Sequence, residues 1–443
     1  MLSYNNRVKI AILGFARDGQ AAYEFFLGQG GHEITICDQD TTKQIPGDTN
    51  SKLGPDYLKN LAGFDLIVRT AGMHPRLIQR ANPDSPDILD KVTGNIDLFY
   101  QYSPSQNIIG VTGTKGKGTT STLISEILKK AGKNVYLGGN IGIPALELLK
   151  QNIKVDDWVV LEQSSFQLID QKHSPKIGIC LMVVPEHLDW HANYDEYIDA
   201  KSQLFIHQKS DDIAIYYAQN DASEDIASAS EGKLLPYFTA PGAEIKNGEV
   251  VIGETSICKT DEIKLLGKHN WQNVCAAVTA VWQITQDREA IKQVVTTFSG
   301  LPYHLELVRE LDGVQYYNDS FGTTPETAIV AIESFTQPKV IILGGSSKNS
   351  DYSALAQAIS KNNVRSVITI GEVSEQIAKN LQFVRYKQIK NGGLTMSEIV
   401  EAARSEAQPG DVVLLSPACA SFDMFEDYKD RGQQFTKVVQ SLT

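Results

Sequence analysis

A glycine-rich turn between two regular elements constrains the fold of this chain more than any other stretch. Residues 107–122 read NIIGVTGTKGKGTTST. The apolar residues at 108–111 predict the end of a buried strand, and those of 123–128 recur at the spacing of a helix over 119–130. A strand, a glycine turn and a helix in this order direct backbone amides and a helix N-terminus toward one point, where they can bind an anion.

Two lysines and several hydroxyl side chains accompany that turn. We expect Lys117 to neutralise a phosphate, since this is the role of the lysine in phosphate-binding loops. The spacing departs from the common loop: Val111 stands six residues before the lysine in place of glycine, and Gly118 follows it in place of serine or threonine. A structural turn with two solvated lysines is the alternative interpretation. The loop residues expected to contact phosphate are Gly113, Thr114, Lys115, Gly116, Lys117, Gly118, Thr119 and Thr120.

The overall composition is that of an ordinary globular protein. A chain of 443 residues suggests roughly three domains. The net charge of −12 argues against a nucleic-acid or membrane-surface protein. The five cysteines are scattered without a CxxC pair, which disfavours a zinc site or a disulfide framework and favours a cytoplasmic protein. No apolar window reaches transmembrane length.

The N-terminal segment predicts a strand, a turn, a helix and a second strand that ends at Asp38. This order is typical of a dinucleotide-binding unit. The GxGxxG fingerprint is absent, because only Gly14 and Gly19 flank the turn. A nicotinamide cofactor is therefore weakly supported, whereas a nucleotide at the strand ends and a purely structural unit both remain open. We place the first domain boundary near Asp97.

Polar residues follow each predicted strand of the middle region. Glu162 follows an apolar strand and is a candidate magnesium ligand, with an exposed strand-end acid as the alternative. His187 and His191 follow the strand 177–184, and we expect metal or phosphate binding of His187 but not of His191. Lys201 on its own would be a surface lysine. Asn270 and Asn273 precede a predicted helix at 274–282 and would either cap it or contact a base.

The pattern restarts near residue 300, where we place the second boundary. Predicted strands at 314–317, 339–343, 364–370 and 411–415 alternate with helices, as in a third α/β unit. The last strand continues into 416–425, whose small and hydroxyl residues are typical of a binding loop. Ordinary turn chemistry is the alternative for Lys348 and Ser421.

Taken in order along the whole chain, these motifs resemble the Mur ligases, the ATP-dependent amino-acid-adding enzymes of peptidoglycan synthesis. The glycine–lysine loop, GNIG at 139–142, HNxxN at 269–273 and NDS at 318–320 fit the family broadly. LEQSSFQL at 161–168 and LLSPACASFD at 414–423 resemble its D-glutamate-adding branch.

The resemblance implies an α/β protein of three domains. These would be a Rossmann-like UDP-binding domain at 1–97, a central P-loop ATPase-like domain with a mostly parallel sheet at 98–300, and a Rossmann-like amino-acid-binding domain at 301–443. The activity would be a cytoplasmic ligase, a monomer, that joins D-glutamate to UDP-N-acetylmuramoyl-L-alanine through an acyl phosphate, with no nucleic-acid or membrane partner.

The resemblance also implies roles for individual residues. Catalysis would depend on Lys117, Glu162, His187 and Lys201. Two magnesium ions would be held by Thr119, Glu162, His187 and a carbamylated Lys201. ATP would further contact Asn273, His304 and Asp319. The two other substrates would contact Phe15, Ala16, Asp38, Gly72, Asn140, Ser164, Thr323, Lys348, Ser421 and Phe422.

Two departures and three rival functions bear on this interpretation. Phe321 stands where related sequences usually have lysine, and His304 where an arginine is common after Leu-Pro, so the expected ATP contacts would be weaker. A folylpolyglutamate synthase-like ligase shares the glycine–lysine loop, and addition of L-glutamate is a further alternative. A non-catalytic nucleotide-binding regulator would not need Lys117, Glu162, His187 and Lys201 together.

Overall fold

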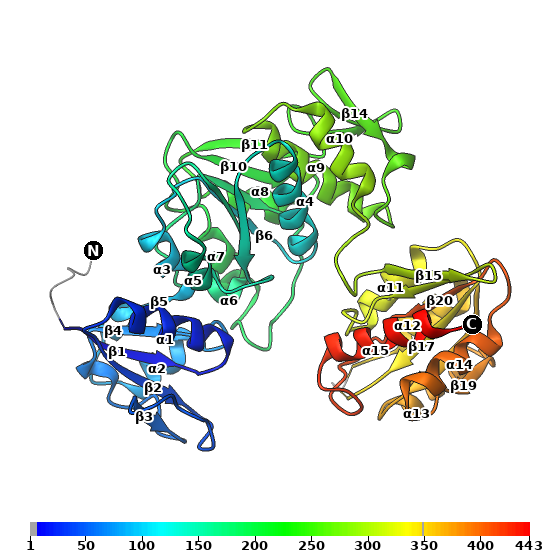
Figure 1. Cartoon of the computed structure of the whole chain (residues 1–443), viewed down its shortest axis with the longest axis horizontal. Helices are drawn as coiled ribbons and strands as arrows, with labels where there is room; N and C mark the ends of the chain where they lie inside the picture. Colours follow the sequence, from blue (N-terminus) through cyan, green and yellow to red (C-terminus); the bar gives the residue numbers. More distant parts are fainter. Residues whose placement is uncertain (1–6, 348–349) are drawn as a thin grey trace. The chain divides into compact units, whose positions relative to one another are not determined.

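The computed structural model describes residues 7–347 and 350–443, and Lys348 lies outside them. The chain divides into two compact units. The first unit comprises the chain up to Glu262 together with Trp271–Thr296. The second unit comprises Ile263–Asn270 and Thr297–Thr443. Figure 1 shows the helices and strands of both units and labels many of them.

The first unit begins with a five-stranded parallel sheet in the order β3-β2-β1-β4-β5. Alternate residues of β1 face opposite sides: Ile10 and Ile12 pack against α1, and Ala11 and Leu13 pack toward α2. This alternation buries both faces of the sheet, as expected for parallel strands. The elements are β1 (Lys9–Leu13), α1 (Arg17–Gln29), β2 (Glu33–Asp38), β3 (Asn50–Leu53), β4 (Leu66–Arg69), α2 (Pro75–Ala81), β5 (Val92–Gly94) and α3 (Asn95–Tyr102).

The second sheet of this unit has six parallel strands in the order β11-β10-β9-β6-β8-β7. Strand β6, which leads into the glycine turn, lies between β8 and β9, so the ends of these three strands meet at one edge. The elements are β6 (Ile108–Thr112), α4 (Lys117–Lys130), β7 (Val135–Gly139), α5 (Ala145–Leu148), β8 (Trp158–Glu162), α6 (Ser165–Leu168), β9 (Ile177–Cys180), α7 (Tyr194–Ser202), β10 (Ile213–Tyr217), α8 (Asp221–Ala227) and β11 (Lys233–Tyr237).

A small antiparallel sheet of three strands and two helices follow, and the sequence pattern had not indicated that sheet. The expectation that Asn270 and Asn273 cap a helix is wrong, because α9 begins at His269 and includes both. Asn270 instead donates from its side chain to the Leu266 carbonyl. The elements are β12 (Glu244–Lys246), β13 (Glu249–Ile252), β14 (Thr255–Lys259), α9 (His269–Trp282) and α10 (Arg288–Thr297).

The second unit is a six-stranded sheet in the order β15-β16-β20-β17-β18-β19, in which only the β15–β16 pair is antiparallel. Helices α11, α12 and α13 cover one face and α14 and α15 the other. The elements are β15 (Glu306–Leu311), β16 (Val314–Asn318), α11 (Pro325–Glu333), β17 (Lys339–Gly344), α12 (Ser353–Lys361), β18 (Val364–Ile370), α13 (Ser374–Phe383), β19 (Ile389–Asn391), α14 (Met396–Glu406), β20 (Val412–Leu415) and α15 (Tyr428–Ser441).

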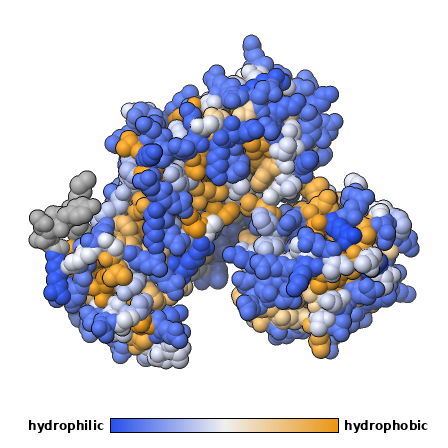
Figure 2. Space-filling model, in the orientation of Figure 1, coloured by the Kyte–Doolittle hydropathy of each residue, from blue (hydrophilic) through white to orange (hydrophobic). Residues whose placement is uncertain are grey.

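The predicted α/β class with mostly parallel sheets is confirmed. The face drawn in Figure 2 is covered mainly by hydrophilic residues, with hydrophobic residues gathered in separate smaller areas. Among the described residues, no helix is both long and apolar enough to cross a membrane.

Candidate active site

The glycine turn adopts a backbone that only glycine supplies without strain. Gly113 and Gly116 have φ angles of 144° and 86°, and a side chain at Gly116 would collide with Asn273. Helix α4 begins at Lys117, two positions earlier than the pattern predicted, so the amides of its first turn follow the glycines directly. The turn therefore has the form of an anion-binding loop.

Lys117 folds back across that turn. Its Nζ donates to the carbonyls of Gly113 at 3.0 Å and Thr114 at 2.9 Å. Burial lowers the pKa of Lys117, while the nearby carboxylates of Glu162 and Glu186 oppose that change. The ammonium group is thus placed between the loop and two acidic side chains, where it can balance phosphate charge.

Lys201 is not a surface lysine: it is 1% exposed. Its Nζ donates to the Gly113 carbonyl at 2.9 Å, the same oxygen that accepts from Lys117, and lies 4.5 Å from the centre of the Tyr197 ring. Burial and the positive charge of Lys117 lower the pKa of Lys201 to about 7. A substantial fraction of this amine is therefore neutral at physiological pH.

Glu162 ends β8 beside the glycine turn and is 5% exposed. Asn140 holds it twice: the Asn140 amide donates to the Glu162 carbonyl at 2.9 Å, and the Asn140 side chain donates to Oε1 at 2.6 Å. The backbones approach so closely that a side chain at Gly139 would strike Glu162. The GNIG motif thus positions a buried carboxylate, and the exposed-acid alternative for Glu162 is wrong.

His187 follows β9 in a strained conformation, with a φ of 59°. Its ring lies 4.7 Å from that of Phe166, and its Nε2 lies 3.6 Å from Glu186. Burial lowers the pKa of His187, which favours the neutral imidazole that binds metals. Strain of this kind is found where a side chain must be aimed at a site.

His191 has a different environment from His187. It is buried, its Nε2 lies 3.0 Å from the Ser165 hydroxyl, and burial lowers its pKa to about 4. Glu196, which also pairs with Arg76 and His74, lies 3.5 Å from its Nδ1. His191 is therefore a buried residue held between Ser165 and Glu196.

Asn273 lies against the glycine turn although it is far away in sequence. Its Oδ1 accepts from the Thr120 hydroxyl at 3.5 Å, and Gly116 leaves the space that the asparagine fills. Thr119 is partly exposed at the same helix end. The fold thus brings Lys117, Glu162, His187, Lys201 and Asn273 into one unit, around the ends of β6, β8 and β9.

Two strand-end loops of the second unit carry the remaining nucleotide candidates. Asp319 follows β16 and accepts from the Ser416 hydroxyl at 2.7 Å and the Leu305 amide at 3.2 Å. Burial raises the pKa of Asp319 to about 7. His304 and Phe321 stack on each other, with ring centres 4.1 Å apart. His304 and Phe321, both expected from the sequence to depart from the family pattern, are therefore neighbours in space.

The amino-acid candidates lie at the same edge of that sheet. Ser421 is buried and Phe422 is 74% exposed, both in the loop after β20. Thr323 precedes Thr324, which caps α11. A main-chain bond from the Ser346 amide to the Ala420 carbonyl joins the loop after β17 to the loop after β20.

The N-terminal candidates surround the end of the first sheet. The Phe15 amide donates to Asp38 at 2.6 Å, and Ala16 precedes α1. The Gly72 carbonyl accepts from the Trp190 indole at 3.0 Å. The Phe15–Asp38 bond and a bond from the Thr70 amide to the Leu13 carbonyl at 3.1 Å place the turn after β1, the end of β2 and the turn after β4 together, as the strand order requires.

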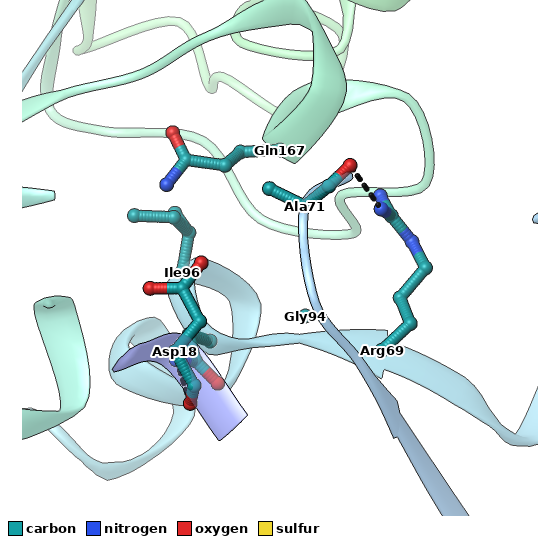
Figure 3. A pocket seen from close by; sticks show the side chains of 7 residues that line it. Asp18, Arg69, Ala71, Gly94, Ile96 and Gln167 are labelled. Carbon is teal, nitrogen blue, oxygen red and sulfur yellow. Dashed lines mark hydrogen bonds between the residues drawn. The ribbon is translucent and has the colours of Figure 1, made fainter. Parts of the chain in front are cut away.

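A pocket of about 10 Å³, room for one water molecule, lies near these turns. Figure 3 shows Asp18 and Ile96 on one side and Gln167 facing them from another segment. Burial raises the pKa of Asp18. The sequence did not indicate this pocket, because its lining residues come from separate elements. They are Asp18, Arg69, Ala71, Gly94, Asn95, Ile96 and Gln167.

Comparison with known proteins assigns a family to this arrangement. A profile of the Mur ligase middle domain matches residues 111–281, and a profile of the Mur ligase glutamate ligase domain matches residues 305–419. A UDP-N-acetylmuramoylalanine–D-glutamate ligase of Acetivibrio thermocellus is 36% identical over 99% of this chain and 97% of its own.

Solved structures share the fold at lower identity. The UDP-N-acetylmuramate–alanine ligase MurC of Thermotoga maritima superimposes with a TM-score of 0.60 and 14% identity, over 98% of this chain and 100% of its own. The MurF ligase of Thermotoga maritima, solved in complex with ADP, gives a TM-score of 0.60 at 16% identity over 99% and 97%. The chain belongs to the Mur ligase family of ATP-dependent ligases.

Proposed function

We propose that this protein is the ATP-dependent ligase that adds D-glutamate to UDP-N-acetylmuramoyl-L-alanine in peptidoglycan synthesis. The observation that carries the proposal is the arrangement of Lys117, Lys201 and Glu162 around the Gly113 turn, in a chain whose full-length relatives bear that activity in their names. The motifs at 161–168 and 414–423 support the D-glutamate branch.

The chemistry joins two anions, a carboxylate and a triphosphate. In the proposed reaction the alanyl carboxylate attacks the γ-phosphorus of ATP, and ADP leaves with the electrons of the broken P–O bond. The amine of D-glutamate then attacks the acyl phosphate, loses a proton and expels inorganic phosphate. Lys117 and the amides of α4 stabilise the charge that is spread over the transferred phosphoryl oxygens.

Magnesium ions would supply the remaining positive charge. The donor set fits: Glu162 offers a buried carboxylate, Thr119 a hydroxyl at the helix end and His187 an imidazole whose pKa is lowered by burial. Among the described residues, no three His, Cys, Asp or Glu side chains converge on one point, and our proposal includes a second anionic ligand.

We propose that a carbamylated Lys201 is that ligand. Its neutral amine attacks carbon dioxide, a C–N bond forms and one proton is released, leaving a carbamate anion. A pKa of about 7 supports this, because the reacting amine must be unprotonated. The new anion would lie beside Lys117, which lowers the cost of burying it.

The substrates would bind at the loop residues of each sheet. Phe15, Ala16, Asp38 and Gly72 would contact the UDP group, with Asn140 and Ser164 near the muramoyl part. Asn273, Asp319 and His304 would contact ATP. Thr323, Lys348, Ser421 and Phe422 would hold D-glutamate, although Lys348 lies outside the described residues.

We also propose three domains, at 1–97, 98–300 and 301–443, because the first unit contains two separate large sheets. All five cysteines are buried thiols, which supports a reducing, cytoplasmic location. A monomer remains our expectation.

The assay that tests the proposal supplies ATP, magnesium, UDP-N-acetylmuramoyl-L-alanine and either glutamate enantiomer. We expect phosphate release only when the UDP substrate and D-glutamate are both present. Release with a folate acceptor would instead support the folylpolyglutamate-type activity, and ATP binding without amide formation on any acceptor would support a regulator. EDTA should abolish turnover, and excess magnesium should restore it.

A further inference from the structure

A fully buried arginine lies in the first turn of α15, in the second unit. Arg431 has no exposed surface and is among the largest fully buried side chains of the described residues. Burial lowers its pKa to about 10, so it stays charged at neutral pH. A buried charge is costly unless the surrounding groups are arranged to receive it.

Its partners in the described part of the chain are oxygens of two loops. Nε donates to the Ser320 hydroxyl at 2.9 Å, and Nη2 donates to the Ser320 carbonyl at 2.8 Å. On its other side, Nη1 donates to the carbonyls of Cys419 at 3.2 Å and Ala420 at 3.4 Å. One rigid, planar guanidinium therefore joins the loop after β16 to the loop after β20.

These two loops carry different candidate contacts. Ser320 directly follows Asp319, which is proposed to contact the nucleotide. Ala420 directly precedes Ser421, which is proposed to hold D-glutamate. Arg431 thus joins the two groups of contacts, next to two direct bonds between the loops, from the Ser416 hydroxyl to Asp319 at 2.7 Å and from the Ala418 amide to the Gly322 carbonyl at 3.0 Å.

The direction of the peptide bonds adds an electrostatic effect. The Ala420 carbonyl and the Ser421 amide belong to one planar peptide unit and point in opposite directions. The carbonyl accepts from the Ser346 amide at 2.9 Å as well as from Arg431, so the Ser421 amide faces away from both donors and is polarised as a donor itself. Among the described residues, no acceptor is bonded to the Ser421 amide. Such an amide suits a carboxylate.

From these contacts we infer that Arg431 is a positioning residue that aligns the nucleotide loop and the glutamate loop, and that it orients the Ser421 amide toward a substrate carboxylate. The inference rests on the proposed function for the identity of the two substrates. Arg431 acts through Ser320 and Ala420 and touches neither substrate.

The test compares Arg431→Met with the matched control Arg309→Met in the full-length enzyme. Arg309 on β15 also donates to main-chain carbonyls of the second unit, those of Val439, Gln440 and Leu442, but it contacts neither loop. We expect Arg431→Met to raise KM for both D-glutamate and ATP by about tenfold or more, with KM for the UDP substrate unchanged. Arg309→Met should leave all three constants unchanged.

Chemical rescue separates alignment from general stability. Guanidinium ion at non-denaturing concentration should lower both KM values of Arg431→Ala toward those of the wild type and should not do so for Arg309→Ala. A lower kcat with unchanged KM values in Arg431→Met, or equal effects in the two methionine variants, would overturn the inference.

Two further arms keep the result decisive. If the Arg431 variants do not fold, Ser320→Ala is tested in their place, because it removes only the hydroxyl that accepts from Nε. It should raise the same two KM values by a smaller factor, and unchanged values would count against the inference. If the wild type forms no amide, the proposed function fails. The alignment role is then judged by calorimetry with ADP, where weaker binding to Arg431→Met than to Arg309→Met supports it and equal binding refutes it.

Discussion

The guanidinium of Arg69 binds both carboxylate oxygens of Asp170. Nε donates to Oδ2 at 2.6 Å and Nη2 to Oδ1, while further bonds run to the carbonyls of Phe166 and Met73. The pair joins the end of β4, in the five-stranded sheet, to the segment that follows α6, between β8 and β9 of the six-stranded sheet of the same unit. The arginine side chain is 1% exposed, so the charge depends on its partner.

Removing that partner should destabilise the first unit. We expect Asp170→Ala to cost about 3–5 kcal/mol, because it leaves a buried guanidinium without a counter-charge. The midpoint of urea unfolding, followed by tryptophan fluorescence, measures the change. Asp56→Ala serves as the control, since Asp56 pairs with Lys59 on the surface and should contribute no more than about 1 kcal/mol. Equal midpoints for the two variants would contradict this prediction.

Lys117→Met should reduce kcat by about 10³-fold or more, because a preorganised charge at the transferred phosphoryl group is lost. The fold should be retained, since methionine fills most of the space of the lysine side chain and the change removes two bonds to loop carbonyls. Phosphate release under saturating substrates and the far-UV spectrum measure the two properties. Lys129→Met, near the exposed end of α4, removes the same charge elsewhere and should leave kcat unchanged. Retained activity in the Lys117 variant would place ATP at another site.

The reactivity of Lys201 should depend on pH and on carbon dioxide. Enzyme prepared without carbon dioxide should be weakly active, and bicarbonate should restore it. With a pKa of about 7, the neutral amine is roughly tenfold more abundant at pH 8 than at pH 6, so recovery should be about tenfold faster at pH 8 when bicarbonate is adjusted to give equal dissolved carbon dioxide at both pH values. The rate of recovery after bicarbonate addition measures this. Full activity without carbon dioxide would exclude the carbamate.

The same group should affect stability without carbon dioxide. The pKa of Lys201 is lower in the folded protein, about 7, than the ordinary value of 10.5. The unfolded chain therefore binds more protons between these values, and the free energy of unfolding should rise as the pH increases from 7 toward 10.5. Comparison of wild type with Lys201→Met, by urea titration at several pH values, isolates this contribution. Parallel pH profiles for the two proteins would refute it.

Restoring the family residues at the stacked pair should improve nucleotide binding. The double variant His304→Arg with Phe321→Lys replaces two rings by two cations, and each cation near a polyphosphate is worth about 1 kcal/mol at a solvated site. We expect KM for ATP to fall about fivefold or more. Phe383→Lys adds a charge at an exposed position on α13 and should not change KM. An unchanged or higher KM in the double variant would indicate that the stack of rings itself binds the nucleotide.

Sequence patterns predicted the large, mostly parallel sheets better than the small antiparallel sheet and the environment of single residues. Apolar runs such as 108–111 and 364–370 define buried parallel strands, and these positions lie in β6 and β18. Glu162 could be assigned to a strand end, but its bond to Asn140 depends on the order of β7 and β8. The burial of Lys201 was not predictable, because helical spacing does not say which face of α7 packs against the Gly113 turn.

The features that could not be predicted from the sequence are contacts between distant segments. The Arg69–Asp170 pair, the contacts of Glu196 and the stack of His304 on Phe321 each involve residues whose partners lie in another loop or element. No local pattern encodes such pairs. His304 and Phe321 stood out as departures from a family pattern, and only the fold places them face to face.

The Gly113 carbonyl accepts from both Lys117 and Lys201, and a carbonyl oxygen has two lone pairs to share. The protons of the two lysines are consequently not independent, since each ammonium group makes it harder for the other to stay charged. Titrating this protein should give two apparent constants that belong to the pair. Assigning either constant to one lysine would require a variant that lacks the other.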